Sequence, residues 1–173
     1  MWRFKLVAVG GTFDELHRGH KTIILKAFKI GEKVIIGLCT DAFARRLRKN
    51  HEISSYTKRL GELVSFLRKN GLLDRAEIIP LNDPYGPTVK SKDIDAIVVS
   101  RETEPRAHDI NDLRKAIGLK PLHIITIDMV PAYDEIPIST TRIYRGEIDR
   151  EGNPVKILQI KSEFRTCLKK RKM

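Results

Sequence analysis

The sequence predicts an α/β fold, with a doubly wound sheet of five parallel strands and helices on both of its faces. Three short runs rich in Val and Ile, at residues 4–9, 34–38 and 94–99, are predominantly apolar, which is typical of strands buried on both faces. Residues 76–81 and 122–127 are two further candidate strands. Amphipathic stretches with helical spacing lie between them. Strands that alternate with helices of about 10–15 residues favour right-handed βαβ units and hence a parallel, Rossmann-like sheet.

Four stretches carry the helical pattern, and residues that commonly begin and end helices support their limits. Thr57 can cap the third helix and Gly71 follows its basic last turn, while Pro105 suits the start of the fourth helix and Gly118 its end. Residues 82–87 are rich in turn formers and follow a strand, so we expect a loop at the ligand-binding end of the sheet. The predicted helices are residues 20–29, 41–49, 57–70 and 105–117.

The composition is that of a folded protein with a heavily charged surface. The chain has 173 residues, of which 41% are hydrophobic and 32% charged. A domain of this size buries roughly 70% of the surface of its unfolded chain, so one domain suffices. We expect this domain to span residues 1–150. A basic extension at 151–173 would pack on it or be partly disordered, and residues 155–160 could add an edge strand.

Several features indicate a cytoplasmic protein. No apolar stretch approaches the ~18 residues of a membrane span, and the first residues do not resemble a secretion signal. Cys39 and Cys167 lie far apart and match no metal or redox spacing, so we expect free thiols in a reducing compartment. The many Lys, Arg and Glu residues beside a single Gln are typical of heat-adapted proteins.

The net charge of +11 would attract polyanions, which include nucleic acids and the phosphates of nucleotides. Much of the excess lies in two basic runs, at residues 45–49 and 169–172. Such runs are more often solvated surfaces, and the chain has no interleaved aromatic residues or recognised RNA motif. Nucleic acid is therefore not the partner that we expect, and an RNA-binding module is the alternative from another functional class.

The loop after the first predicted strand carries the residues that we expect to bind ATP. Gly10 and Gly11 let a ligand approach the backbone closely, beyond the strand ends where open α/β sheets bind ligands. Their spacing matches neither a dinucleotide fingerprint nor a P-loop. Two histidines three residues apart on the opening turn of a helix can donate hydrogen bonds to phosphate oxygens. The residues that follow the glycines in this pattern are Thr12, Phe13, His17, Gly19 and His20.

Two alternatives for the histidine pair remain open. His17 and His20 could cap the helix, although Gly19 between them argues against a mere cap. They could also bind a metal, but no third Cys or His lies nearby in the sequence to complete a zinc site.

A second candidate for phosphate binding follows the last predicted strand and a polar loop. Three hydroxyl residues that enter a helix present side-chain oxygens and unpaired N–H groups at the positive end of its dipole, which suits the β and γ phosphates of ATP. An ordinary helix N-cap explains them as well. An arginine next to them can form charge-assisted hydrogen bonds to phosphate. The segment is Ile138, Ser139, Thr140, Thr141 and Arg142.

Both segments resemble motifs of the nucleotidyltransferase superfamily. Residues 12–20 match its signature Thr-x-x-x-x-His-x-Gly-His, and residues 138–142 are similar to its closing Ile-Ser-Ser-Thr-x-Arg segment. The resemblance extends over residues 4 to 147 and is closest to the archaeal phosphopantetheine adenylyltransferases; the bacterial enzyme lacks the loop at 83–87. The segments that carry this closer resemblance are 55–59, 83–87 and 96–103.

The resemblance implies that residues 1–150 are a nucleotidyltransferase domain that joins ATP to 4′-phosphopantetheine, giving dephospho-coenzyme A and pyrophosphate in coenzyme A synthesis. Coenzyme A itself could be an inhibitor. The acceptor phosphate is already a nucleophile, so the protein would position the reactants and stabilise charge. Another phosphorylated acceptor, such as nicotinamide mononucleotide, is the alternative. Mg²⁺ is expected with ATP, and Asp14, the nearest carboxylate, fits a turn-stabilising role at least as well as a metal-binding one.

The resemblance also implies roles for individual residues. His20 and Thr12 would bind the α-phosphate, with Lys49 gripping the acceptor phosphate in competition with Arg46 and Arg48. Tyr85 could stack on adenine or line the pantetheine arm. The catalytic residues would be Thr12, His20 and Lys49, and the ATP-binding residues Gly10, Gly11, Thr12, Phe13, His17, Gly19, His20, Arg101, Ile138, Ser139, Thr140, Thr141 and Arg142. The acceptor-binding residues would be Thr12, Lys49, Tyr85, Ser100 and Arg101.

Overall fold

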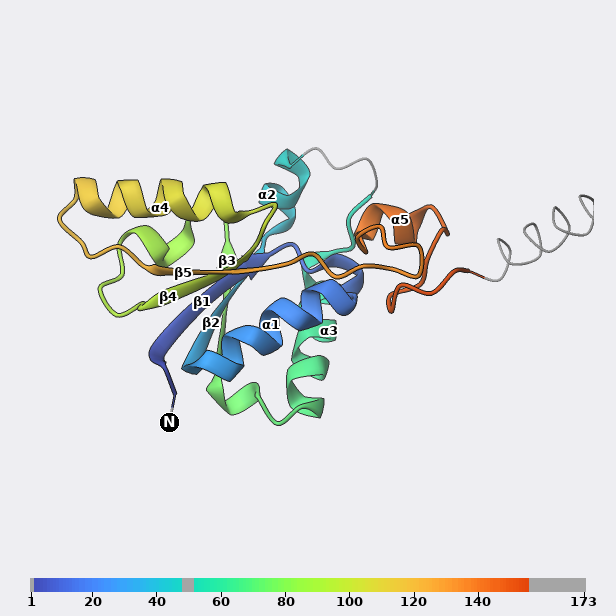
Figure 1. Ribbon diagram of the computed structural model, residues 1–173, viewed down its shortest axis with the longest axis horizontal. Helices are drawn as coiled ribbons and strands as arrows, with labels where there is room; N and C mark the ends of the chain where they lie inside the picture. Colours follow the sequence, from blue (N-terminus) through green and yellow to red (C-terminus); the bar gives the residue numbers. More distant parts are fainter. Residues whose placement is uncertain (1, 48–51, 156–173) are drawn as a thin grey trace, which may run out of the picture.

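The protein is built on a five-stranded parallel sheet with the strand order β3-β2-β1-β4-β5 (Figure 1). The computed structural model describes residues 2–47 and 52–155. All four strand pairs run parallel, as the alternation of strands and helices predicts. The strands are β1 (Phe4–Gly11), β2 (Gly31–Cys39), β3 (Ala76–Leu81), β4 (Ala96–Ser100) and β5 (His123–Ile127).

Helices cover both faces of the sheet, which confirms the doubly wound α/β fold. α1 and α3 pack on one face, and α4 lies with η3 on the other (Figure 1). The helices are α1 (Arg18–Ile30), α2 (Asp41–Arg46), α3 (Tyr56–Lys69), α4 (Glu104–Ala116) and α5 (Thr140–Tyr144). Three short 3-10 helices are η1 (Asp14–Leu16), η2 (Leu73–Arg75) and η3 (Gly86–Val89).

The central strands are apolar on both sides because each face of the sheet has its own core. In β4, Val98 packs into the core beneath α1 and α3, whereas Val99 packs into the core beneath α4. In β1, likewise, Val7 packs into the core beneath α1 and α3, and Ala8 packs into the core beneath α4. Alternate side chains of a strand point to opposite faces, so a strand buried on both faces has no polar side.

The third helix begins earlier than the sequence predicts. Its N-cap is Ser55, whose Oγ accepts a hydrogen bond from the backbone N–H of Lys58 at 3.3 Å. The prediction of Thr57 as the cap was therefore wrong, because Thr57 lies inside the first turn. Gly71 and Gly118 follow their helices with φ angles of 64° and 77°, which confirms them as the residues at which the chain leaves the helix.

Two predicted elements extend beyond the described residues. α2 is capped at its end by Leu47, and the remainder of the helix predicted at 41–49 lies outside the described ranges. Of the edge strand predicted at 155–160, only the first residue is described. The predicted basic extension spans 151–173, and its part after residue 155 also lies outside the described residues.

The order of the strands places a reversal of winding beside β1. From β1 the chain winds through β2 and β3 to one edge of the sheet, and it then returns to β4 and winds to the opposite edge. Helices on opposite faces leave a crevice at the carboxyl ends of the two strands where such a reversal occurs. The loops that follow β1 and β4 therefore border the expected ligand site.

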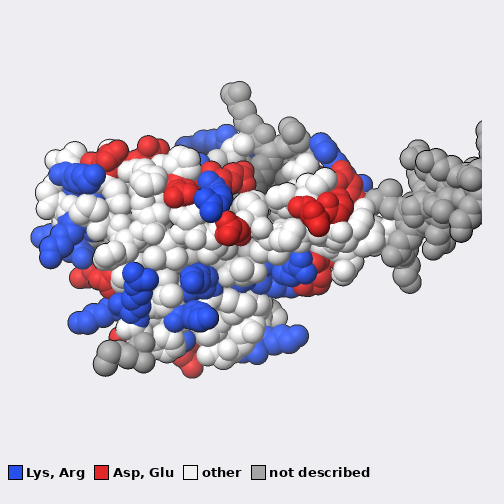
Figure 2. Space-filling view, viewed as in Figure 1, with Lys and Arg blue, Asp and Glu red and all other residues white. Residues whose placement is uncertain are grey.

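The surface in Figure 2 carries charges of both signs. Lys and Arg side chains are scattered among Asp and Glu side chains over the described part of this face, without one continuous basic surface. Within the described ranges, no helix has both the length and the apolar character needed to cross a bilayer.

Two glycine substitutions test the packing at the start of β2. A Cβ at Gly31 would lie 2.6 Å from Cγ2 of Val7, so Gly31→Ala should destabilise the fold by about 1–3 kcal/mol through overpacking. Gly61→Ala, inside α3, is the control: a Cβ there would meet no described atom within 4 Å, and the change should stabilise by about 0.5–1 kcal/mol. Denaturant unfolding measures both, and equal effects would contradict this packing.

Candidate functional site

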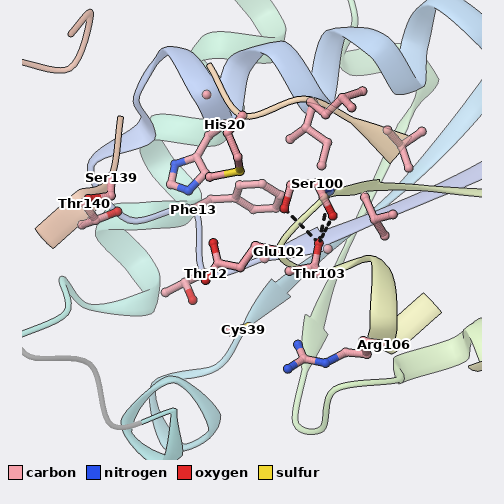
Figure 3. A pocket seen from close by; sticks show the side chains of 18 of the residues that line it. Thr12, Phe13, His20, Cys39, Ser100, Glu102, Thr103, Arg106, Ser139 and Thr140 are labelled. Carbon is pink, nitrogen blue, oxygen red and sulfur yellow. Dashed lines mark hydrogen bonds between the residues drawn. The ribbon is translucent and has the colours of Figure 1, made fainter. Parts of the chain in front are cut away.

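A cavity of about 610 Å³ opens at the carboxyl ends of β1, β2 and β4. One wall is the loop from β1 into α1, and α2 with the end of β2 adjoins it. The start of α4 forms another wall, and residues 127–130 and 138–141 complete the lining. Figure 3 shows Phe13 and His20 on one side of this cavity and Ser100 and Thr103 on another. The cavity lies where the strand order predicts a ligand site.

The connection between β1 and α1 is strained. Phe13 and Glu15 have φ angles of 49° and 51°, in the left-handed region that residues with a Cβ rarely adopt. The carboxylate of Glu15 is paired with Arg150 at 2.7 Å and lies 3.6 Å from Lys58. These contacts come from a distant turn and from α3, so other parts of the chain hold the loop in its conformation.

Asp14, between the two strained residues, is fully buried. Its Oδ1 accepts a hydrogen bond from the backbone N–H of Ser54 at 3.3 Å, and its backbone carbonyl accepts one from Oγ1 of Thr140 at 3.2 Å. Asp14 thus joins the loop after β1 to the segments before α3 and at the start of α5. These contacts fit the turn-stabilising role predicted for its carboxylate.

The histidine pair lies at the first turn of α1. His17 is the N-cap of the helix, and its Nδ1 accepts a hydrogen bond from the backbone N–H of His20 at 3.4 Å. The two imidazole rings stack with their centroids 3.7 Å apart, and the Phe13 ring meets His20 edge-on. A Cβ at Gly19 would lie 3.0 Å from the His17 ring, so glycine leaves room for this stack. His17 therefore caps the helix, and both rings also line the cavity.

The segment that enters α5 also lines the cavity, and Figure 3 shows Ser139 and Thr140 on the same side as His20. Ser139 is the N-cap, and its Oγ accepts a hydrogen bond from the backbone N–H of Arg142 at 3.4 Å. Thr140 is buried, and its Oγ1 donates a hydrogen bond to the backbone carbonyl of Asp14 in the loop after β1. The hydroxyl residues of the predicted second motif and those of the first therefore border one cavity, although more than a hundred residues separate them.

The arginine of the second motif is placed differently from the prediction. Arg142 does not line the cavity. Its guanidinium binds the carboxylates of Asp134 and Glu147 at 2.5 and 3.0 Å, and its side chain is only 12% exposed. The hydrogen bond to Asp134 raises the pKa of Arg142. With two carboxylates beside it, Arg142 joins α5 to the neighbouring turns rather than presenting its charge to the cavity.

Two further predicted residues, Arg101 and Tyr85, do not line the cavity. Arg101 has a side chain that is 69% exposed and is paired with Asp128 at 2.7 Å, and this hydrogen bond raises the pKa of Arg101. Tyr85 packs against the core beneath α4. Lys49 lies outside the described residues. The predicted residues that do line the cavity are Gly10, Gly11, Thr12, Phe13, His17, Gly19, His20, Ser100, Ile138, Ser139, Thr140 and Thr141.

The sequence interpretation missed Arg106 on α4 and gave no individual role to Glu102 and Thr103, which come just before this helix. Glu102, Thr103 and Arg106 line the cavity, and Thr103 Oγ1 accepts a hydrogen bond from the backbone N–H of Ser100 at 3.2 Å (Figure 3). Their position after a strand at the reversal of winding was the signal that could have identified them. Among the described residues, no three His, Cys, Asp or Glu side chains are grouped closely enough to hold a metal ion.

The chain is similar to known proteins over most of its length. The family model described as cytidylyltransferase-like matches residues 8–146. The phosphopantetheine adenylyltransferase of Methanothermobacter thermautotrophicus is 48% identical over 154 residues, which are 89% of this chain and 92% of that protein. The phosphopantetheine adenylyltransferase of Methanosarcina mazei is 49% identical over 149 residues, or 84% of this chain and 94% of that protein.

Solved structures share the fold. The crystal structure of a protein with unknown function from Archaeoglobus fulgidus superposes with a TM-score of 0.65 and 31% identity. The match covers 77% of this chain and 98% of that one.

The ion pair between Asp134 and Arg142 predicts a pH-dependent contribution to stability. Its hydrogen bond from Arg142 holds the pKa of Asp134 below the ordinary value of 3.8. The pair therefore stabilises the fold above that value, and its contribution is lost as the pH falls through the lower folded-state pKa. Asp134→Asn should lower the melting temperature at neutral pH, and the difference from wild type should shrink in acid. Asp128→Asn, in the exposed pair with Arg101, should change little. Thermal melts across pH measure this, and a difference that is independent of pH would contradict the assignment.

Proposed function

The chain belongs to the phosphopantetheine adenylyltransferase family, and from this premise we propose that its cavity joins the adenylyl group of ATP to 4′-phosphopantetheine. The products are dephospho-coenzyme A and pyrophosphate. The observation that carries the proposal is the meeting of both phosphate-binding segments, 10–20 and 138–141, in one cavity of about 610 Å³. A cavity of this size can take two phosphorylated substrates in contact with each other.

The reaction needs no nucleophile from the protein. A phosphate oxygen of the acceptor forms a bond to the α-phosphorus of ATP, and the bond from that phosphorus to the bridging oxygen of pyrophosphate breaks. Negative charge develops on the α-phosphate and on the departing pyrophosphate. The contribution of the protein is alignment of the two substrates and stabilisation of this charge.

We assign the α-phosphate to the loop after β1. His20 and Thr12 line the cavity there, and the stack with His17 together with the edge of Phe13 fixes the plane of the His20 ring. A ring held in one orientation can donate a hydrogen bond to the developing charge without reorganisation. Gly10 and Gly11 allow the nucleotide to lie against the strand end.

The β and γ phosphates are assigned to the turn that enters α5. The hydroxyls of Ser139 and Thr141 and the backbone N–H groups at this helix end are suited to an anion. Arg106 lines the cavity from α4 and is proposed as a cation for the phosphates of one substrate. Arg101 and Arg142 would reach the same phosphates only by leaving their carboxylate partners.

We assign the pantetheine arm of the acceptor to the wall formed by β2 and α2. The end of β2 and the start of α2 supply apolar side chains, Cys39 and Phe43, which suit an uncharged pantetheine arm. Lys49, which follows α2 in the sequence, is proposed to bind the acceptor phosphate. Mg²⁺ would enter bound to ATP and retain several waters, so no protein ligand is assigned to it. We also propose that the enzyme works in the cytoplasm.

A substrate panel tests the proposed function. Pyrophosphate release from MgATP should depend on 4′-phosphopantetheine and should be at least about tenfold slower with equal concentrations of nicotinamide mononucleotide, whose acceptor end differs in shape and polarity. Continuous detection of pyrophosphate, with mass spectrometry of dephospho-coenzyme A, measures both reactions. Faster release with nicotinamide mononucleotide would reject the acceptor and retain the adenylyl transfer, whereas no release with either would reject the function.

His20→Ala tests the role of the histidine pair. Loss of a donor to the charge that develops on the α-phosphate should lower kcat by about 10²–10³-fold, with little change in melting temperature. His108→Ala is the matched control, because His108 is exposed on α4 outside the cavity and should leave kcat unchanged. A near-normal kcat for His20→Ala would contradict the assigned role.

A further inference from the structure

A buried arginine continues the β1–β2 pairing past the point where the strands separate. The last paired residues of the two strands are Gly11 and Leu38. One nitrogen of Arg59, Nη1, then donates to the backbone carbonyls of the next residue on each strand, Thr12 at 2.9 Å and Cys39 at 2.7 Å. Both of these residues line the cavity. A single guanidinium therefore sets the separation of the two walls just beyond the end of the sheet.

The other two nitrogens of the same guanidinium bind two more residues. Nε donates to the carbonyl of Ser54 at 2.8 Å, and Ser54 in turn donates its N–H to Asp14 in the strained loop. Nη2 binds the carboxylate of Asp41 at 2.8 Å, at the first residue of α2. The Arg59 side chain is 1% exposed, so these bonds form out of contact with solvent. Three segments that are separate in sequence, at residues 12, 39–41 and 54, converge on one side chain.

Two other arginines bind backbone carbonyls in the same manner away from the cavity. Arg114 is 2% exposed and donates to the carbonyls of Thr88, Ser91 and Lys120, beneath α4. Arg75 donates to carbonyls around the start of β2, at the opposite end of the sheet. Neither arginine, nor any residue whose carbonyl it binds, lines the cavity. All three arginines donate hydrogen bonds to backbone carbonyls, but only Arg59 binds carbonyls of residues that line the cavity.

We propose that Arg59 is a positioning residue that aligns the two substrates. The inference depends on the proposed transfer between two substrates in one cavity. A bond between an acceptor oxygen and the α-phosphorus forms only when the wall that carries Thr12 and the wall that carries Cys39 stand at a fixed separation. Each wall keeps its own contacts to its substrate when Arg59 is changed, so binding is retained while alignment is lost. Arg59 therefore acts on kcat more than on either KM.

A lysine cannot reproduce this arrangement. The planar fork of arginine directs N–H groups from three nitrogens to separated acceptors, whereas an ammonium is a single point of charge with three donors. Arg59→Lys keeps the positive charge beside Asp41 and removes the bridge between the two carbonyls. Arg114→Lys makes the same change at a site of equal burial and is the matched control.

The experiment measures kcat, both KM values and the melting temperature of wild type, Arg59→Lys and Arg114→Lys. We expect both variants to melt at lower temperature. Arg59→Lys should lower kcat by about 10- to 100-fold with each KM within about threefold of wild type, because a displacement of about 1 Å has effects of this size. Arg114→Lys should keep its kcat within about twofold. Titration of ATP by calorimetry should give similar affinities for all three proteins.

The outcomes separate this inference from the function that it depends on. An unchanged kcat in Arg59→Lys, or an equal fall in Arg114→Lys, would overturn the positioning role and leave the function intact. No transfer by the wild type would overturn both. If Arg59→Lys does not fold, Asp41→Asn decides, because it removes only the half-exposed carboxylate partner. A fall in kcat with unchanged KM then supports the role, and an unchanged kcat overturns it.

Discussion

The cavity proposed as the active site depends on the strained connection that leaves β1 and enters α1. Two of its residues, Phe13 and Glu15, hold left-handed backbone conformations, and such conformations persist only where surrounding contacts outweigh their cost. Those contacts come from the distant segments that contain Ser54, Thr140 and Arg150. The positions of the stacked histidines are therefore a property of the whole fold, because residues at least 40 positions away in the sequence hold the loop that precedes them.

Different segments of the chain line the cavity with different chemical groups. The loop after β1 and the turn into α5 offer histidine, hydroxyl and backbone N–H donors, whereas β2 and α2 offer apolar side chains. Donors of the first kind suit a triphosphate, and the apolar wall suits an uncharged arm. The buried guanidinium of Arg59 lies between these regions and binds both.

The sequence was sufficient to predict the fold and the residues of the first motif that border the cavity, since both depend on short-range patterns. Apolar runs predict the strands, and the glycine pair with the histidines lies within eleven consecutive residues. The partners of charged side chains could not be predicted in this way. Arg142 ends a segment that the sequence predicts to bind phosphate, yet its guanidinium is bound by the carboxylate of Asp134. The proposed role of Arg59 could not be predicted either, because three of its four acceptors are backbone carbonyls, which carry no residue signature.

A crystal structure of the protein with dephospho-coenzyme A tests the central claim most directly, because this product carries the transferred phosphate between adenosine and the pantetheine arm. The account predicts that the phosphate next to the adenosine ribose lies within hydrogen-bonding distance of His20 and Thr12, with the pantetheine arm along the wall formed by β2 and α2. A product bound outside this cavity, or one whose phosphate lies away from both residues, would contradict it.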